Sequence, residues 1–329
     1  MSYSELAPIV LFCYNRPQIL LNTLSHLRNN SLASRSSLIL YCDGPKKFPD
    51  PKVDEVRSIA HQITGFKSVT TITRECNWGL APNIIDGVTK TVSKFGKAII
   101  LEDDLVVSPF FLEFMNQSLS VYQNDPSVAS ICGWVPPLNL SNKPDTFFLS
   151  HADCLGWATW ARAWKCFEPD TKLLYRRLMQ LPVALRKKFN HFNNYNYVGL
   201  LRLQIQGLVN SWAIRWKASA FLHEMLSLYP GHSLVYHCDS FVQATHCNFS
   251  FPQEAVSNFP IPVHRIPISE RPQMLLLYGE YEKKAFQNQV TPMKIFRNWG
   301  NLFYFKLRSL LKRSKKQASD HRKPKLNHM

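Results

Sequence analysis

KAIILEDDLVVSPFFLEF, residues 97–114, combines a strand pattern with a cluster of acids. Its aliphatic run, residues 98–101, is of the kind found in strands that are buried on both faces. Three carboxylates, Glu102-Asp103-Asp104, follow directly, although the chain of 329 residues carries a net charge of +16. Ser108 and Pro109 then fit the N-cap and the first position of a helix. The three acids at the end of a buried strand are the feature that needs an explanation.

Four other stretches also predict strands, and helical patterns lie between the first four strands and before the fifth. The predicted strands are 7–15, 37–44, 68–74, 97–104 and 127–134, and the predicted helices are 16–30, 50–63, 83–95 and 108–126. Such alternation predicts an α/β fold with a mostly parallel sheet flanked by helices. From about residue 135 the alternation weakens and aromatic residues become dense. That second part indicates either an elaborated binding face or a tryptophan-rich core.

Each of the first four predicted strands turns polar where it ends, at Asn15, Asp43, Arg74 and Glu102. The carboxyl ends of parallel strands share one edge of the sheet, where α/β proteins bind ligands. Adjacent carboxylates repel one another unless a positive group binds them. A divalent cation, Mn²⁺ or Mg²⁺, takes one or two carboxylates and completes its shell with substrate phosphates. The acid triplet therefore predicts a metal and a diphosphate, although acidic runs are also common in solvated loops.

The neighbouring loops fit a nucleotide diphosphate. Asp43 can accept hydrogen bonds from a base or ribose, and Arg74 can pair with phosphate oxygens. Ordinary alternatives are a helix cap at residues 15–17 and a turn at residues 43–44. The residues predicted to line this pocket are Cys13, Asn15, Arg16, Asp43, Arg74, Asn77, Gly79, Asn83, Glu102 and Asp103.

Four segments in this order, PIVLFCYNRP, YCDG, AIILEDDLVVSPFFLEFMNQSLSVYQNDPSV and CLGWATW, resemble nucleotide-sugar glycosyltransferases of the GT-A fold. The resemblance is to the N-acetylglucosaminyltransferase I type and to bacterial enzymes grouped with the family 2 glycosyltransferases, over roughly residues 6–250. It implies a Rossmann-like sheet and a metal-dependent, inverting transfer from a UDP-sugar to a saccharide or lipid-linked acceptor in polysaccharide biosynthesis. It also implies that Asp43 contacts uracil, that Asp104 binds the metal, and that residues 155–157 face the donor sugar and the acceptor.

An inverting transfer needs a carboxylate that takes the proton of the acceptor hydroxyl. The resemblance implies an Asp just ahead of Trp212, but this chain has Asn210-Ser211 there. The remaining candidates for the base are Asp239, which we rank first, Asp153 and Glu224. The alternative is a weakened or inactive relative that acts as a membrane-associated binding or scaffold subunit.

Two further groups of residues have alternative interpretations. Trp157, Trp160 and Trp212 can stack on an acceptor sugar, but tryptophan clusters are more often packed in a core. His246 can complete a metal shell or contact the diphosphate, and it can equally be a structural histidine.

The positive charge is concentrated near the C-terminal end. Residues 283–329 hold 13 Lys and Arg and one acid, so the rest of the chain is nearly neutral, which argues against a nucleic-acid-binding body. Residues 291–329 predict a basic amphipathic helix and a disordered tail at an anionic membrane surface, or alternatively a helix packed on the domain. We expect a cytoplasmic protein that is peripheral at the inner membrane face, because no membrane span, signal peptide or CxxC pair is found.

The predicted organisation has three parts. Residues 1–135 form the nucleotide-sugar-binding half, residues 136–290 form the acceptor-binding half of the same domain, and residues 291–329 form the helix and tail. The sequence has neither a P-loop nor a dinucleotide fingerprint, which argues against P-loop kinases and Rossmann dehydrogenases.

Overall fold

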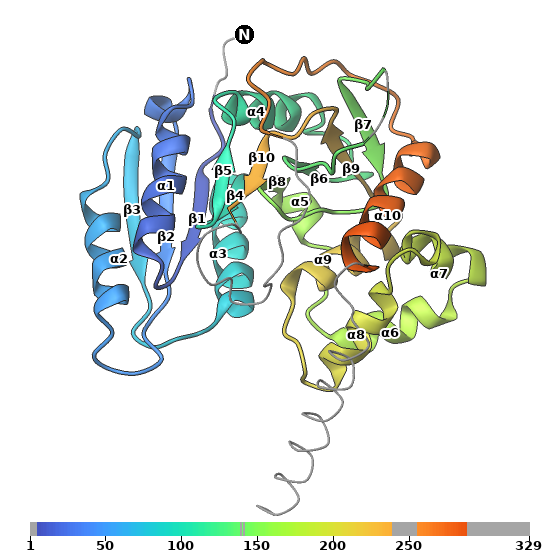
Figure 1. The fold of residues 1–329 in the computed structure, drawn as a ribbon, viewed down its shortest axis with the longest axis horizontal. Coiled ribbons are helices and arrows are strands. Elements are labelled where there is room, and N and C mark those ends of the chain that lie inside the picture. The colour runs from blue at the N-terminus through green and yellow to red at the C-terminus, as the bar shows by residue number, and fades with distance from the viewer. Residues whose placement is uncertain (1–4, 139, 141, 239–254, 288–329) are drawn as a thin grey trace, which may run out of the picture. The chain divides into compact units, whose positions relative to one another are not determined.

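A computed structural model describes residues 5–138, 140, 142–238 and 255–287 (Figure 1). Two predicted site residues, Asp239 and His246, and the predicted helix and tail of residues 291–329 lie outside this part of the chain. Residues up to Lys283 form one compact unit. No helix in the described ranges is long and apolar enough to cross a membrane.

A single sheet of eight strands organises this unit. The strand order is β3-β2-β1-β4-β8-β6-β9-β7. Strands β1 to β4 are parallel neighbours, β8 runs antiparallel between β4 and β6, β9 is parallel to β6, and β7 is antiparallel to β9. The sheet is mostly parallel, as predicted, and is consistent with a GT-A, Rossmann-like fold. The strands are β1 Ile9–Cys13, β2 Ser37–Cys42, β3 Ser68–Thr73, β4 Lys97–Glu102, β6 Val128–Cys132, β7 Thr146–Leu149, β8 Trp157–Trp160 and β9 Leu226–Pro230.

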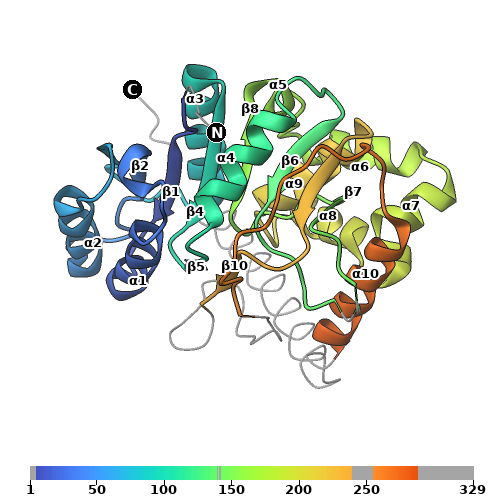
Figure 2. The same ribbon diagram turned by 90° about the horizontal axis from the view of Figure 1, so that it is seen from above.

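Helices cover both faces of this sheet. α1 and α2 pack together on one face, and α3 packs against β1 and β4 on the other (Figure 2). The caps follow the sequence: a proline begins both α1 and α2, and Gly96 ends α3 in the left-handed conformation, with φ of 76°. The helices are α1 Pro17–Arg28, α2 Pro51–Gln62, α3 Leu80–Phe95, α4 Phe111–Val121, α5 Ala161–Trp164, α6 Thr171–Gln180, α7 Val183–Phe189, α8 Tyr197–Ile205, α9 Trp212–Leu222 and α10 Pro272–Gln287, with 3₁₀ turns at Ala33–Arg35 and His191–Asn193.

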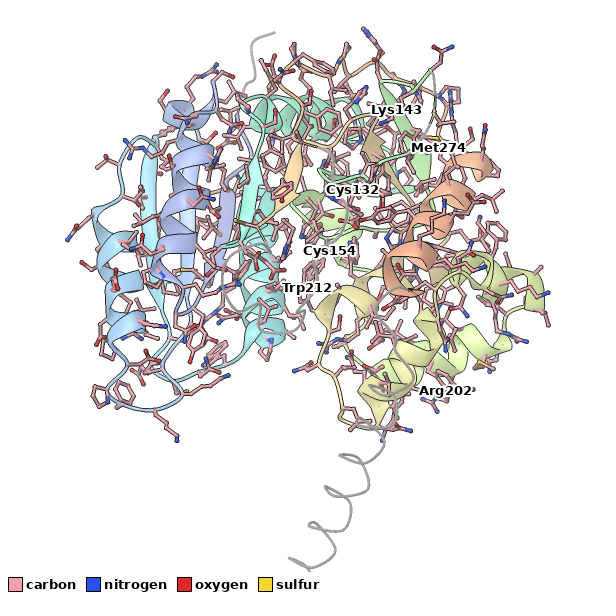
Figure 3. The ribbon with its side chains drawn as sticks, in the orientation of Figure 1. Cys132, Lys143, Cys154, Arg202, Trp212 and Met274 are labelled. Atoms are coloured by element: carbon pink, nitrogen blue, oxygen red, sulfur yellow. The ribbon has the colours of Figure 1, made fainter. Side chains whose placement is uncertain are left out.

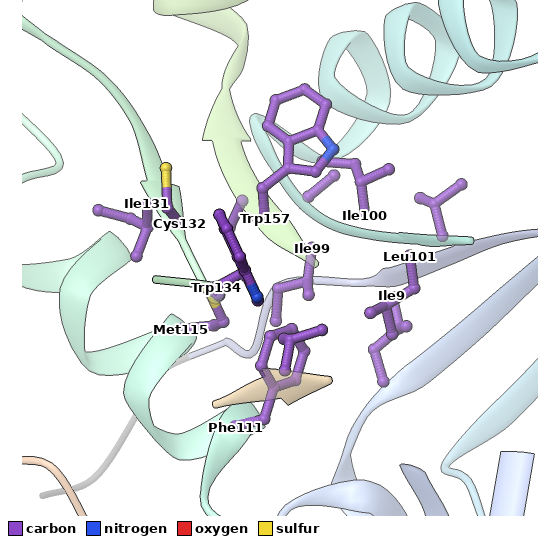
Figure 4. Close-up of a cluster of buried hydrophobic side chains, with 14 of the residues drawn as sticks. Ile9, Ile99, Ile100, Leu101, Phe111, Met115, Ile131, Cys132, Trp134 and Trp157 are labelled. Carbon is purple, nitrogen blue, oxygen red and sulfur yellow. The ribbon is translucent and has the colours of Figure 1, made fainter. Parts of the chain in front are cut away.

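The core lies between the sheet and these helices. Ile99 of β4, Phe111 of α4 and Trp157 of β8 are fully buried in one apolar cluster (Figure 4). β1 is buried along its whole length because helices cover it on both sides. This packing gives the loops at the carboxyl ends of the strands a rigid support.

The structure corrects the predicted start of α4. We predicted a helix from Ser108, but α4 begins at Phe111. The residues just ahead form a short strand, β5 Leu105–Val107, which pairs antiparallel with β10 Val235–His237. The backbone N–H of Ser108 continues this pairing by donating to the carbonyl of Leu234 at 2.9 Å. The β5–β10 ribbon brings a distant part of the chain beside the acid triplet.

Candidate active site

Two acids of the triplet, Asp103 and Asp104, are bound by one guanidinium group. Arg16, in the loop between β1 and α1, donates through Nη2 to Asp103 and, at 2.9 Å, to Oδ2 of Asp104. On the other side of the loop, Thr23 of α1 donates its hydroxyl to the backbone carbonyl of Asp103 at 2.6 Å. The parallel pairing of β1 with β4 places Arg16 and the acids at the same sheet edge. Arg16, Asp103 and Asp104 thus form the centre of the site.

Repulsion and burial shift the pKa values of this cluster. Burial and the neighbouring acids raise the pKa of Glu102 well above its ordinary value, and burial raises the pKa of Asp103 despite the nearby Arg16. The two carboxylates in turn raise the pKa of Arg16, outweighing the opposite effect of its burial. Asp103 and Asp104 therefore share one firmly protonated guanidinium beside Glu102, and an added cation would relieve the remaining repulsion among the three acids.

The cluster fits a hard divalent cation. Oδ2 of Asp103 is buried and has no hydrogen-bond partner among the described residues. Within the same residues, no three carboxylate, imidazole or thiolate groups form a ready-made coordination shell. A cation here would take one or two protein oxygens, from Asp104 and Asp103, and the rest from phosphate and water, as Mg²⁺ commonly does.

The sequence analysis missed a histidine at this site. His237 ends β10, and its Nε2 lies 3.5 Å from Oδ2 of Asp104. The backbone is fixed as well, because the N–H of Cys238 donates to the carbonyl of Asp104 at 2.8 Å. Only the β5–β10 pairing reveals this contact, since 133 residues separate the two side chains in sequence. The sequence signal was the short apolar segment ahead of His237, which we did not interpret as a strand.

Asp43, at the end of β2, organises the next loop. Its two carboxylate oxygens accept four hydrogen bonds of 2.8–3.0 Å: from the backbone N–H groups of Gly44, Trp78 and Gly79 and from the Asn77 amide. Gly79, the N-cap of α3, has a φ of 78°, which favours glycine. Asp43 therefore lies at the centre of a closed turn. A contact with uracil would have to compete with these four hydrogen bonds.

The Arg74 side chain is likewise bound by other residues of the chain. Its Nε donates to Oδ1 of Asn83 at 2.9 Å, its Nη2 donates to Asp86 at 2.5 Å, and its guanidinium lies 3.8 Å from the centre of the Trp78 ring. Arg74 is 8% exposed. These partners belong to the chain itself, so the structure does not leave the guanidinium directed at a phosphate.

Two of the other predicted pocket residues lie at the end of β1. Cys13 is buried, with its Sγ 3.5 Å from that of Cys42, so its side chain faces the core. Asn15 is half-buried in the loop beside Arg16. Of the predicted set, the residues that gather at the acid cluster are Arg16, Glu102, Asp103 and Asp104.

A second loop, residues 151–156, approaches the acid cluster from the other half of the sheet. Gly156 has a φ of 58°, and a Cβ there would lie 2.7 Å from the Val235 side chain and 3.3 Å from that of Leu101. The charge of Glu102 also contributes to raising the pKa of Cys154, although burial is the main cause. Cys132, at the end of β6, donates its thiol to the backbone carbonyl of Asp153 in this loop at 3.5 Å. This loop therefore lies against the end of β4.

Asp153 is the candidate base that this loop supplies. Its Oδ1 accepts the N–H of Leu155 at 2.8 Å, and its Oδ2 accepts the hydroxyl of Tyr278, in α10, at 2.8 Å. Burial raises the pKa of Asp153 to about 6, and the two hydrogen bonds oppose the rise. A carboxylate with this pKa is mostly ionised at neutral pH and can accept a proton.

The structure separates the candidate Glu224 from the site, and Asp239 lies outside the described residues. Glu224 is exposed in the turn that leads into β9. Because β9 runs in the same direction as β4, this turn lies at the opposite edge of the sheet from Glu102, so Glu224 is corrected to a surface residue. Asn210 and Ser211 serve the start of α9: Asn210 accepts a bond from Arg215 at 3.2 Å, and the Ser211 hydroxyl accepts the N–H of Ile214 at 3.3 Å.

The three tryptophans predicted to contact an acceptor are buried. Trp157 stacks on Trp212 with ring centres 5.4 Å apart, and Trp164 and Trp216 complete the cluster. Trp160 donates its indole N–H to the carbonyl of Leu119 at 3.2 Å. None of Trp157, Trp160 and Trp212 is more than 3% exposed. The cluster joins β8 to α9, which favours the core interpretation over sugar stacking.

A buried polar network lies behind Asp153. Lys217 of α9 places its Nζ 2.6 Å from Nδ1 of His151 and 2.9 Å from Nε2 of His191. His191 in turn lies 2.5 Å from Glu282 of α10, which also accepts the hydroxyl of Tyr197. Burial lowers the pKa of Lys217 to about 7 and that of His191 to about 4. The network fixes α9 and α10 behind the loop that carries Asp153.

No protein-family profile matches the chain, and no curated protein is similar to it in sequence. Among solved structures it is similar to the mannosyltransferase PcManGT from Pyrobaculum calidifontis in complex with GDP-Man and Mn²⁺, with a TM-score of 0.39 and 11% identity over 68% of this chain and 71% of that one. It is also similar to residues 1–349 of S. aureus TarS, with a TM-score of 0.39 and 8% identity over 71% of this chain and 60% of that one. Likeness at these scores carries no argument about activity.

Proposed function

We propose that the chain is a metal-dependent glycosyltransferase that moves a sugar from a nucleotide diphosphate, expected to be UDP, to a saccharide or lipid-linked acceptor with inversion. The observation that carries this proposal is the acid cluster of Glu102, Asp103 and Asp104 at the carboxyl end of β4. It combines crowded acids, whose burial and mutual repulsion raise the pKa of Glu102, with an Asp103 carboxylate oxygen that has no partner among the described residues. A diphosphate and its divalent cation would satisfy both.

The chain's own residues have defined tasks in this reaction. Asp104 and Asp103 would hold the divalent cation, and Arg16 orients both carboxylates. When bound, that cation stabilises the negative charge of the departing diphosphate. The loop of residues 151–156 presents Asp153 as the base, held by Leu155 and Tyr278.

The proposed chemical step is a single displacement. Asp153 takes the proton of the acceptor hydroxyl, and the hydroxyl oxygen forms a bond to the anomeric carbon from the face opposite the leaving group. The bond from that carbon to the diphosphate oxygen breaks, and its electron pair leaves with the nucleoside diphosphate. Inversion follows because one displacement occurs at the anomeric carbon.

Ligand-induced thermal stabilisation tests the proposal directly. We expect UDP with Mn²⁺ to raise the melting temperature of the full chain by several degrees. Asp104→Ala should abolish this rise, whereas Asp54→Ala, an exposed acid on α2, should keep it. The proposal fails if no nucleoside diphosphate stabilises the protein with either Mn²⁺ or Mg²⁺.

Turnover distinguishes an enzyme from an inactive binding subunit. Release of UDP from a panel of UDP-sugars should be detected in the wild type and should fall at least a hundredfold in Asp153→Asn. UDP binding that persists without turnover of any nucleotide sugar would instead support the scaffold alternative.

A further inference from the structure

One part of the described chain is strongly basic and contains no acid. Residues 171–223, which span α6 to α9, hold nine Lys and Arg and neither Asp nor Glu. Lys217 is buried, and Lys188 pairs with Glu270 at 2.6 Å. The cations of this stretch that form no ion pair with an acid of the described chain include Lys172, Arg176, Lys187 and Arg202, all of which are exposed.

Several of these cations surround one surface hollow. α6, α7 and α8 enclose a volume of about 340 Å³, and Arg186, Lys187 and Arg202 contribute to its lining. Arg186 donates to the carbonyls of Met179 and Leu181 at 2.8 Å and so holds the end of α6. Figure 3 shows Arg202 on α8, on the side of the molecule away from the β5–β10 ribbon. We call this feature the α6–α8 hollow.

Apolar side chains are exposed at the same place. Met179 and Val183 line the hollow and are 37% and 57% exposed. Leu185 and Leu203, on α7 and α8, are 38% and 41% exposed. Exposed apolar groups combined with unpaired cations are typical of surfaces that contact a bilayer, where the apolar groups enter the interface and the cations meet lipid phosphates.

The wall of the hollow includes a strained turn. His191, Phe192 and Asn193 have φ of 46°, 57° and 69°, left-handed values that non-glycine residues rarely adopt. Buried His191 anchors the turn through its contacts with Lys217 and Glu282. Asn193 lines the hollow, and Phe192 beside it is 41% exposed. The buried network therefore holds an aromatic side chain in solvent at this surface.

We propose that the α6–α8 hollow and its rim are a docking surface for an anionic lipid bilayer. Charge complementarity carries the assignment: the surface offers several cations, and the chain supplies no acid from residue 171 to residue 223 to oppose them. The exposed apolar residues favour a bilayer over a soluble polyanion, which would be bound by the cations alone. The residues of this surface all lie between residues 171 and 223 and include none of the basic residues after residue 290.

Vesicle flotation of the full chain tests the proposal. Vesicles of phosphatidylcholine with about 30% phosphatidylglycerol should bind the wild type, and vesicles of phosphatidylcholine alone should bind it weakly. The double variant K187Q/R202Q should lower the partition coefficient about thirtyfold, since each cation at an anionic surface contributes about a fivefold change. The matched variant K52Q/K67Q, which removes two exposed cations near α2, should stay within twofold of the wild type.

Three further measurements complete the test. R202K should keep most of the binding, because the charge is retained, and V183S should lower it about fivefold through lost apolar contact. Equal binding by K187Q/R202Q and the wild type, with unchanged melting temperatures, would overturn the proposal and assign membrane contact to the segment after residue 290. If K187Q/R202Q instead lost binding to a soluble sulfated polysaccharide while vesicle binding was unchanged, the surface would be a polyanion site.

Discussion

The two oxygens of the Asp103 carboxylate lie in different environments. One oxygen accepts a bond from Arg16, and the other is buried without a partner among the described residues. The acid triplet itself was evident from the sequence, because three carboxylates after an aliphatic run are unusual. The bridging role of Arg16 was not, because it depends on the pairing of β1 with β4.

Tyr278→Phe tests how the hydroxyl of Tyr278 affects the pKa of Asp153. The tyrosine hydroxyl stabilises the ionised carboxylate, so its removal should raise the pKa of Asp153 above about 6. If Asp153 is the base, the acidic limb of the pH–rate profile should move up by about one pH unit, the effect of one hydrogen bond to a charged group. The rate at pH well above 8 should remain near the wild-type value. An acidic limb that does not move would contradict the assignment of Asp153.

Lys217→Met tests the buried network through the pH dependence of stability. The folded state lowers the pKa of Lys217 to about 7, from 10.5, so between these pH values the unfolded chain binds a proton that the folded chain does not. The free energy of unfolding is therefore highest above pH 10.5 and falls as the pH falls towards 7. The wild type should therefore gain about 2 kcal/mol relative to Lys217→Met between pH 7 and pH 9, measured by urea unfolding. Lys172→Met, on the surface of α6, should follow the wild type. Parallel curves for Lys217→Met and wild type would show that Lys217 is not buried as a neutral amine.

At the scale of elements, the strands with a local sequence pattern could be predicted, whereas the strands that depend on long-range pairing could not. β1, β2 and β4 were predicted because each is an apolar run followed by polar residues, and β3 because its β-branched residues favour a strand. β5 and β10 are three residues each, and neither has a pattern of its own until the two pair. The start of α4 was predicted too early for the same reason, since the backbone of Ser108 is paired with Leu234 beside β10 and the helix begins only at Phe111.

Gly133→Ala tests whether the β5–β10 ribbon shapes the site. An added Cβ at Gly133 would lie 2.4 Å from the carbonyl oxygen of Gly156 and 2.7 Å from the side chain of Val235. We expect a loss of about 1–3 kcal/mol in unfolding free energy and loss of the thermal response to UDP with Mn²⁺. Gly96→Ala has a comparable backbone cost at the end of α3, and its Cβ meets no atom of the described residues within 4 Å, so its thermal response should persist. A full response in Gly133→Ala would show that the ribbon is dispensable.

At the scale of the molecule, the two predicted halves share one sheet. β8, from the second half of the chain, lies between β4 and β6, and β6 has β8 and β9 as its neighbours. The α/β class followed from the sequence, but this interleaving did not, because antiparallel pairing of distant strands leaves no periodic signal. The aromatic second half was equally ambiguous until its tryptophans were seen to join β8 and α9.

A fragment of residues 1–135 tests this interleaving. Without β8 and β9, β4 becomes an open edge and β6 loses both of its partners, so we expect no cooperative urea transition by circular dichroism. The full chain should unfold with one main transition. A fragment that unfolds cooperatively would show that the boundary near residue 135 separates independent folding units.

The turn over His191–Asn193 also bears on the order in which the protein is completed. No glycine favours its left-handed shape, and its anchor, Glu282, lies 91 residues further along the chain. Gly279, also on α10, leaves room for this turn, since a Cβ there would lie 2.9 Å from the carbonyl oxygen of His191. Synthesis on a ribosome releases α6 to α8 long before α10. A nascent chain therefore exposes these basic helices before the turn over His191–Asn193 is fixed. The proposed membrane-docking surface is complete only after α10 has left the ribosome.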